Sequence, residues 1–139
     1  MVIMSVDYGD ARTGVAACDK LQMLASPVCV LKEAYVPRLI EKIAALAKER
    51  RVERFVVGLP LNMDDTEGER AAKCREFAAE LSKATGIEAV MVDERLTTVE
   101  AHEHLSFVNV HGKKRKEIVD AVSAVVILED YLASLEKAD

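Results

Sequence analysis

The chain opens with VIMSVDY at residues 2–8, a mostly apolar and partly β-branched run that ends close to an acid, Asp7. An apolar run of this length is typical of a strand that is buried on both faces. A turn follows over residues 9–14 (GDARTG), and its two glycines are free to take positive φ. The apolar sequence resumes at residues 15–18, so the first two strands are predicted to form a hairpin.

Further along the chain the hydrophobic period changes from strand to helix. A third strand is predicted at residues 27–31, and apolar residues then recur at spacings of three and four over residues 39–47, with Pro37 acceptable in the first turn of that helix. Two further strands are predicted at residues 55–58 and 89–92, separated by a helix at 69–85 that Gly86 ends. A short helix is predicted at 97–105, a basic connection at 108–116 and a long final helix at 117–135.

This order of elements predicts an α/β fold with a mixed five-stranded sheet flanked by helices. Three antiparallel strands come first, and two parallel strands are then added through crossover helices. The 139 residues are enough for one domain, which we expect to span residues 1–139, and too few for two. No apolar run approaches the roughly 20 residues that a membrane span needs, and the first residues do not resemble a signal peptide.

Charge and cysteine usage narrow the class of protein. The formal net charge is −5, whereas a domain that binds nucleic acid over a broad surface is usually basic. A nucleic-acid partner would therefore need a local basic patch, and a divalent metal to offset nearby carboxylates.

The cysteines are odd in number and lie in no C-x-x-C spacing; they are Cys18, Cys29 and Cys74. We therefore expect buried thiols in a reducing cytoplasm rather than a zinc site.

Acids beside strongly apolar sequence are the candidate metal ligands. Asp7 closes the first strand, Asp93 and Glu94 follow the last strand, and Asp120 lies early in the final helix. If the first and last strands are neighbours, Asp7 and the Asp93/Glu94 pair meet where the strand ends open into a crevice. Clustered carboxylates need a counter-charge, which Mg²⁺ or Mn²⁺ supplies. Each acid alone is more commonly a turn residue, or, for Asp120, a partner of Lys116.

Four motifs resemble those of the YqgF (RuvX) family, in order and over almost the whole chain. They are DYGDARTGVA at residues 7–16, VGLPLNM at 57–63 followed by TEG at 66–68, DERLTTVEA at 93–101, and the basic run at 113–116 with Asp120 and Ala121 behind it.

The resemblance implies an RNase H-like fold related to the resolvase RuvC. It also implies a Mg²⁺- or Mn²⁺-dependent nuclease that processes the 5′ end of pre-16S ribosomal RNA, or a Holliday junction resolvase. Carried over, Asp7, Glu94 (or Asp93) and Asp120 are the catalytic acids. Asp7, Glu94 and Asp120 would hold two metal ions, one activating water and the other stabilising the leaving oxygen.

Basic residues near these acids are the candidate contacts to the sugar-phosphate backbone. The densest cluster includes Lys113, Lys114 and Lys116, and its place at a helix start is unfavourable for the helix dipole, which favours a phosphate contact over a solvated surface. Arg12 and Arg95 adjoin proposed acids and either pair with them or contact phosphate.

Three function classes remain open from the sequence. The first is the nuclease, acting on structured RNA or on branched DNA, as a monomer or a homodimer. The second is a non-catalytic nucleic-acid-binding domain, which retention of the acids disfavours. The third is a sugar kinase or actin-like ATPase, whose phosphate loop also opens with Asp-x-Gly, but which needs a second domain to close over ATP.

Overall fold

Five strands form one mixed sheet in the computed structural model, which describes all residues except 23, 61–66, 94–111 and 139, and only the backbone at 112–120 and 136–138. The spatial order of the strands is β3-β2-β1-β4-β5. β1, β2 and β3 pair antiparallel, and β1, β4 and β5 pair parallel, as the element order predicted. The strands are β1 (Ile3–Asp7), β2 (Thr13–Cys18), β3 (Ala25–Leu31), β4 (Arg54–Leu59) and β5 (Glu88–Asp93).

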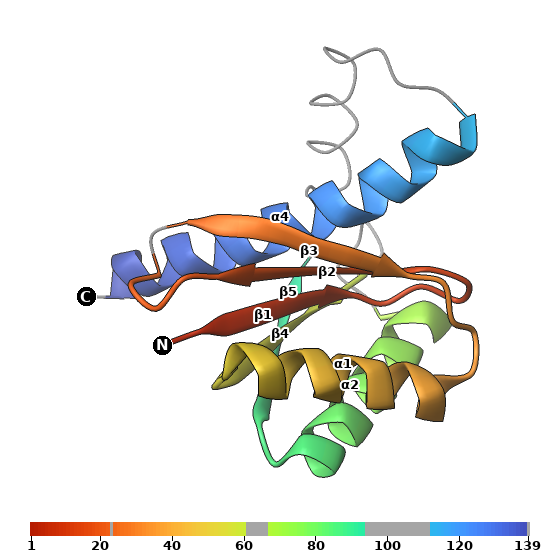
Figure 1. The fold of residues 1–139 in the computed structure, drawn as a ribbon, viewed down its shortest axis with the longest axis horizontal. Coiled ribbons are helices and arrows are strands. Elements are labelled where there is room, and N and C mark those ends of the chain that lie inside the picture. The colour runs from red at the N-terminus through yellow and green to blue at the C-terminus, as the bar shows by residue number, and fades with distance from the viewer. Residues whose placement is uncertain (23, 61–66, 94–111, 139) are drawn as a thin grey trace.

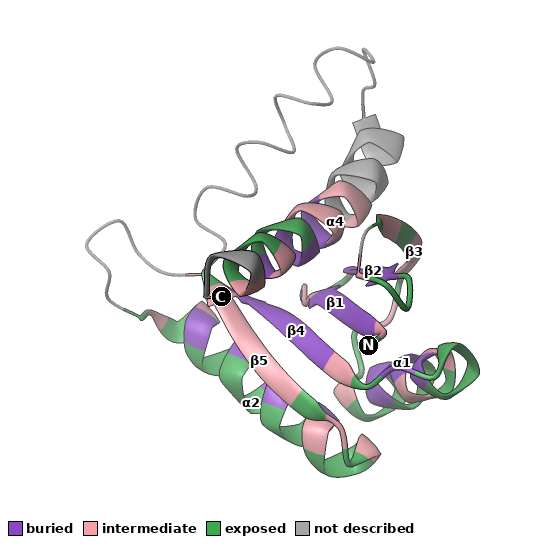
Figure 2. Cartoon of the chain, turned by 90° about the vertical axis from the view of Figure 1, so that its left-hand side faces the viewer, coloured by how far each residue is buried: buried purple, intermediate pink, exposed green. Residues whose placement is uncertain are grey.

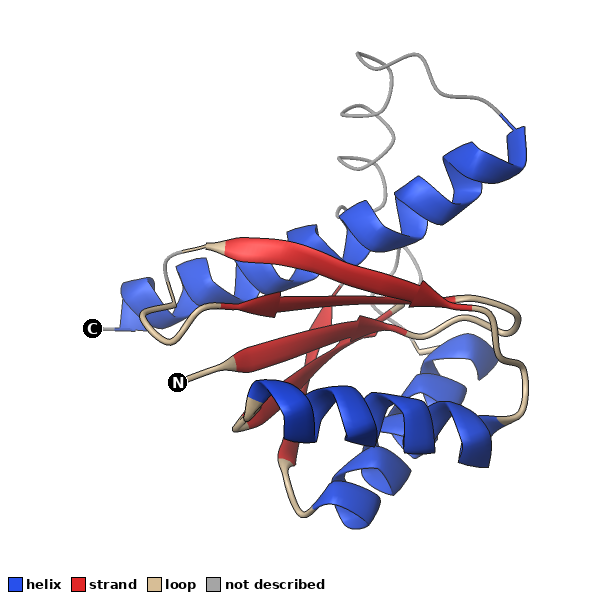
Figure 3. Ribbon diagram, viewed as in Figure 1, coloured by secondary structure: helices blue, strands red, loops and turns tan. Residues whose placement is uncertain are grey.

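Helices cover both faces of this sheet. α1 (Val36–Arg50) and α2 (Glu69–Thr85) lie on one face, and the long α4 (Gly112–Ala138) crosses the other (Figures 1 and 3). α4 runs in the opposite direction to β1, so its first turns lie toward the carboxyl end of β1 (Figure 1). β4 and β5 run parallel to β1. The parallel strands are connected through helices, as parallel pairing requires.

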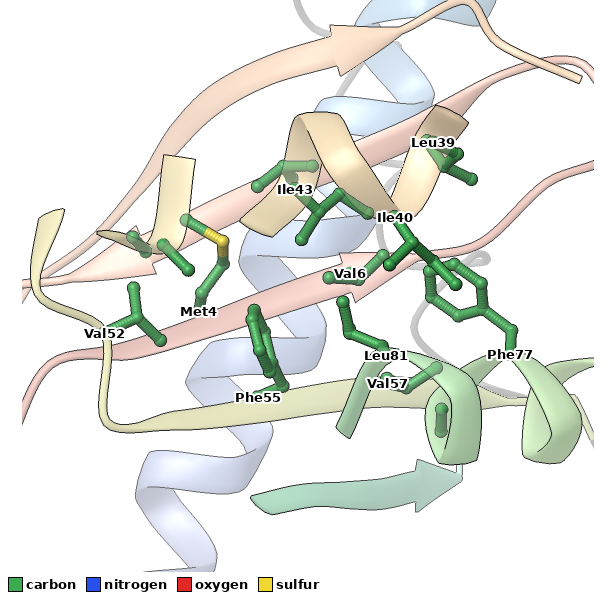
Figure 4. Close-up of a cluster of buried hydrophobic side chains, with 14 residues drawn as sticks. Met4, Val6, Leu39, Ile40, Ile43, Val52, Phe55, Val57, Phe77 and Leu81 are labelled. Atoms are coloured by element: carbon green, nitrogen blue, oxygen red, sulfur yellow. The ribbon is translucent and has the colours of Figure 1, made fainter. Parts of the chain in front are cut away.

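Two apolar clusters, one on each face of the sheet, hold the three layers together. Met4 and Val6 of β1 point into the cluster shared with α1 and α2 (Figure 4), while Ile3 joins the cluster under α4. This alternation buries β1 on both faces, which explains why its sequence is mostly apolar. β4 is buried in the same way, whereas the edge strand β5 is half-buried (Figure 2).

Glycines end one helix and tighten one loop. Gly86 adopts φ 74° behind α2 and ends that helix, as predicted. Of the glycines that the structure describes, only Gly86 has positive φ, so the turn after β1 does not use the freedom of its two glycines to take positive φ. Gly9 is required there for a different reason, because a Cβ at this position would collide with the carbonyl oxygen of Arg12.

The final helix begins earlier than the sequence suggested. α4 starts at Gly112, so the basic run at 113–116 lies in its first turns and not in a connection before it. Lysine and arginine are good helix formers, and this propensity extends the helix beyond its apolar stripe. The helix predicted at 97–105 lies outside the described residues. Within the described part of the chain, none of the helices is long and apolar enough to span a membrane.

Cys18 and Cys74 are buried as predicted, whereas Cys29 on the edge strand β3 is only half-buried. Burial raises the pKa of the Cys29 thiol above its ordinary value. That thiol is therefore protonated, and of low reactivity, at neutral pH.

Candidate active site

The carboxyl ends of the parallel strands place two of the predicted acids at one edge of the sheet. Asp7 is the last residue of β1, and Asp93 is the last residue of β5. The two strands are not neighbours, because β4 lies between them, with Val57 paired to Val6 and Leu59 paired to Asp93. Two strand spacings therefore separate the backbones of β1 and β5, about 10 Å. The condition that these strands be adjacent is not met.

Strand alternation divides Asp7 and Asp93 between the two faces of the sheet. Asp7 has the same parity as Ile3 and Ser5, which face α4, and it is half-buried. Asp93 has the same parity as Met91, which packs toward α2, and it is exposed. Because successive strand residues point to opposite faces, Asp93 lies on the face away from Asp7.

A buried hydrogen bond sets the position of α4 along β1. The hydroxyl of Ser5 donates to the carbonyl oxygen of Ala124 at 2.6 Å. Asp7 follows Ser5 by two strand residues, about 6.6 Å, and position 120 precedes Ala124 by one helical turn, about 6 Å. Because α4 runs opposite to β1, both steps lead to the same edge of the sheet (Figure 1). The backbone at Asp120 is thereby brought toward the end of β1.

The loop between β1 and β2 starts directly after Asp7 and is closed by local contacts. The N–H of Gly9 donates to the hydroxyl of Thr13 at 3.3 Å, and Thr13 is fully buried. The Gly9 backbone packs against the carbonyl of Arg12, which leaves no space for a side chain at position 9. Arg12 itself is half-buried in this loop. The loop is compact, and its conformation depends on glycine.

Arg70, in the first turn of α2, ties this loop to the helix layer. One guanidinium nitrogen donates to the carboxylate of Asp10 at 2.7 Å, and another donates to the backbone carbonyl of Tyr8. The guanidinium also lies 4.9 Å from the centre of the Tyr8 ring. The Tyr8 ring in turn stacks on Phe77 at 4.4 Å, with the planes within 1° of parallel. These contacts connect the peptide after Asp7 to two turns of α2.

Sequence reasoning missed Arg70, although a signal was present. A cation in the first turn of a helix is unfavourable for the helix dipole, and the same argument singled out the basic run of α4. Applied at the start of α2, it marks Arg70 as a residue with a specific partner. Ser5 carries a similar signal, since it is a polar side chain inside an apolar strand.

Burial raises the pKa of Tyr8, although the positive charge of Arg70 opposes the shift. The phenol therefore stays neutral throughout the physiological range. Its ring serves as an apolar platform between Arg70 and Phe77 rather than as an ionised group.

Several predicted site residues fall outside the described residues. These are Glu94 and Arg95, and the side chains of Asp120, Lys113, Lys114 and Lys116. Where the structure does describe side chains, it brings together no group of three His, Cys, Asp or Glu residues able to hold a metal. The proposed set of Asp7, Glu94 and Asp120 includes only one described side chain, that of Asp7.

Comparisons with known proteins identify relatives over nearly the whole chain. The family model described as "RuvX: Holliday junction resolvase" matches residues 1–134. A protein of Lachnospira eligens named "Putative pre-16S rRNA nuclease" is 41% identical over 140 residues, covering 99% of this chain and 100% of the relative. A protein of Halothermothrix orenii with the same name is 43% identical over 132 residues, covering 95% and 94%.

Solved structures show the same fold at low sequence identity. RuvC of Thermus thermophilus in complex with a Holliday junction substrate matches with a TM-score of 0.62 at 12% identity, covering 98% of this chain and 96% of that chain. The fowlpox virus resolvase in complex with Holliday junction DNA matches with a TM-score of 0.60 at 12% identity, covering 97% and 99%. These likenesses confirm the RNase H-like fold class.

Proposed function

Because the chain belongs to the RuvX family of Holliday junction resolvases, we propose that it is a metal-dependent endonuclease that hydrolyses phosphodiester bonds. One observation carries the proposal. The half-buried carboxylate of Asp7 ends the central strand β1 on the face that α4 covers, and the Ser5–Ala124 hydrogen bond directs the backbone of Asp120 to the same edge. Carboxylate oxygens at such an edge are ligands that divalent cations such as Mg²⁺ and Mn²⁺ prefer.

In this proposal Asp7, Glu94 and Asp120 hold Mg²⁺ or Mn²⁺. Carboxylate oxygens are the ligands that these hard cations prefer, so the donor set fits. When bound, the metal ions would activate water and stabilise the leaving oxygen of the cleaved phosphodiester. The chain's own residues orient the ligands, through the end of β1, the loop behind it and the register of α4.

The direction in which the Asp93 side chain points from β5 favours Glu94 over Asp93 as the metal ligand. Asp93 lies on the α2 face of the sheet, away from Asp7 and α4. A carboxylate on that face is badly placed to share a cation with Asp7. We therefore assign the ligand to Glu94 and leave Asp93 as a residue at the rim of the site.

The substrate we favour is structured RNA, and the process is maturation of the 5′ end of pre-16S ribosomal RNA. In this proposal the protein acts in the cytoplasm as a single domain over residues 1–139. The names of relatives about 40% identical over nearly their full lengths support this choice. The family description supports branched DNA as the second candidate. In either case Lys113, Lys114 and Lys116, together with Arg12 and Arg95, would contact the sugar-phosphate backbone.

Incubation of the purified chain with substrates of both kinds tests this function. The substrates are a 5′-extended 16S precursor and a four-way DNA junction, each with Mg²⁺, with Mn²⁺ and with chelator. We expect metal-dependent cleavage of the RNA and none after chelation, and the matched control lacks all three acids (Asp7→Asn, Glu94→Gln, Asp120→Asn). Cleavage of the junction alone would select the resolvase. Binding without cleavage in either metal would indicate a non-catalytic domain.

A further inference from the structure

The side chain of Arg70 makes three contacts with the segment directly behind Asp7. It reaches the Asp10 carboxylate at 2.7 Å, the carbonyl of Tyr8 and the face of the Tyr8 ring. The Arg70 and Asp10 side chains are 35% and 75% exposed, so their ion pair alone contributes little to stability. The hydrogen bond to the Tyr8 carbonyl is of another kind, because it holds a backbone group.

Asp7 lies at the last rung of the sheet, where regular pairing stops. Its partner on β2 is Gly14, while the pairing of β1 with β4 ends one residue earlier, at Val6. The peptide that leaves Asp7 therefore depends on interactions outside the sheet. Arg70 supplies one of them by donating to the Tyr8 carbonyl, and the Tyr8–Phe77 stack supplies another.

We propose that Arg70 is a positioning residue for the metal ligand Asp7, acting through the Tyr8 carbonyl and Asp10 to hold the loop between β1 and β2. This role rests on the proposed function, in which Asp7 binds metal. Ligands must be held within about 0.5 Å of their productive position, and a group that orients a ligand typically changes metal affinity or activity by about 10- to 100-fold when removed.

A direct contact of Arg70 with nucleic acid fits the structure less well. Two of its guanidinium nitrogens already donate to groups of the chain, and its Cζ lies over the Tyr8 ring, 4.9 Å from the ring centre. A phosphate contact would compete with these partners. A role in positioning the loop between β1 and β2 requires only the contacts that Arg70 already makes.

Arg75 provides a matched control on the same helix. It forms an ion pair with Glu67, with Nε 2.6 Å from the carboxylate, and makes no contact with the β1–β2 loop among the interactions of the described residues. Arg70→Gln and Arg75→Gln thus each remove one arginine ion pair from α2. Only Arg70→Gln removes a hydrogen bond next to Asp7.

The first measurement is hydrogen exchange of the metal-free, full-length protein. We expect faster exchange of the amides of residues 8–13 in Arg70→Gln, and no change there in Arg75→Gln. Equal exchange in the two variants would overturn the proposal. If Arg70→Gln does not fold, Arg70→Lys carries the same comparison, because lysine keeps the charge beside Asp10 but loses the planar fork.

The second measurement is Mn²⁺ binding by calorimetry, followed by steady-state cleavage. We expect Arg70→Gln to weaken Mn²⁺ binding and lower the maximal rate by about 10- to 100-fold, with KM for nucleic acid within about twofold of wild type. Arg70→Lys should recover part of the loss. A raised KM with unchanged Mn²⁺ affinity would make Arg70 a nucleic-acid contact and overturn the proposal.

The same data separate this inference from the proposed function. If the wild type binds Mn²⁺ and cleaves nucleic acid, but Arg70→Gln matches Arg75→Gln in every readout, only the role of Arg70 is wrong. If the wild type binds no Mn²⁺ and cleaves nothing, the proposed function fails, and the role of Arg70 fails with it.

Discussion

The two ends of the sheet each carry an arginine network, but the two networks join different kinds of structure. At the amino ends of β4 and β5, Arg54 donates to the Tyr131 hydroxyl at 2.8 Å and lies 3.5 Å from the carboxylate of Glu88. All three residues belong to regular elements. At the carboxyl ends, Arg70 reaches from α2 to a loop, at Tyr8 and Asp10.

Under the proposed function, this difference separates an end that mainly stabilises the fold from an end that carries the site. Arg54 connects β4 to β5 and to α4, so its loss should weaken the packing of whole elements. Arg70 holds a short irregular segment behind Asp7, so its loss should change a site more than the fold. In open α/β sheets the carboxyl ends of the strands are where ligands bind. The variants below test this division, from the largest expected effect to the smallest.

If Asp7 is a metal ligand as proposed, Asp7→Asn should lower the cleavage rate by more than about 100-fold, because losing a ligand costs more than losing a group that orients one. The metal-free variant should melt at the same temperature as wild type or higher, since a carboxylate held for a metal is a cost when no metal is bound. Cleavage assays and thermal melts check both. Strong unfolding would make Asp7 a structural acid and remove the distinction between the two ends.

Replacing Lys113, Lys114 and Lys116 with Gln should weaken nucleic-acid binding without comparable loss of maximal rate. For each phosphate interaction that the substitutions remove, the slope of log K against log salt should flatten by about 0.9 on duplex DNA, or about 0.7 on single strands. Binding isotherms at several salt concentrations measure this slope. A large fall in maximal rate with the slope intact would instead place these lysines in the catalytic centre.

Arg54→Met at the amino end should lower the free energy of unfolding by about 1–3 kcal/mol, because the Tyr131 hydroxyl loses its donor and the ion pair with Glu88 is broken. The exposed position of Glu88 limits the contribution of the ion pair. Cleavage by the folded variant should remain within about twofold of wild type. Denaturant titration and activity of the same preparation test this, and a selective loss of activity would contradict the division.

Mn²⁺ should raise the melting temperature of the wild type through binding to the folded state. At tenfold excess over Kd the stabilisation is about 1.4 kcal/mol, and Mg²⁺ without substrate phosphates should give less. The shift should be blunted in Asp120→Asn and retained in Arg54→Met. An equal shift in a variant lacking Asp7, Glu94 and Asp120 would mean that the metal binds elsewhere.

Breaking the ion pair of Glu67 and Arg75 should have the smallest effect on stability, and it gives a baseline for the substitutions at both ends of the sheet. The hydrogen bond from Arg75 lowers the pKa of the Glu67 carboxyl. A carboxyl group whose pKa is lower in the folded state stabilises the fold when the pH is above its pKa in the unfolded state. This stabilisation is lost as the pH falls through the pKa of the folded state. Arg75→Gln should therefore be slightly less stable than wild type at pH 7, with the difference shrinking below about pH 4.3. A difference that persists at low pH would point to reduced packing by the arginine stem.

The sequence alone predicted most of the fold, because hydrophobic period is a local property. The mostly apolar run before Asp7 indicated a doubly buried strand, and the end of α2 at Gly86 was visible as a glycine behind a periodic segment. The change from short strands to helices and back implied antiparallel and then parallel pairing. The family motifs, read in order, pointed to the RNase H-like fold that the solved structures confirm.

Only the tertiary structure decided how these elements are set against each other. It places β4 between the strands that carry Asp7 and Asp93, and it puts those two acids on opposite faces. It also joins Arg70 to a loop 60 residues earlier in the chain. Strand order, strand parity and helix phase depend on contacts between distant segments, whereas sequence periodicity reports only which face of each segment is apolar.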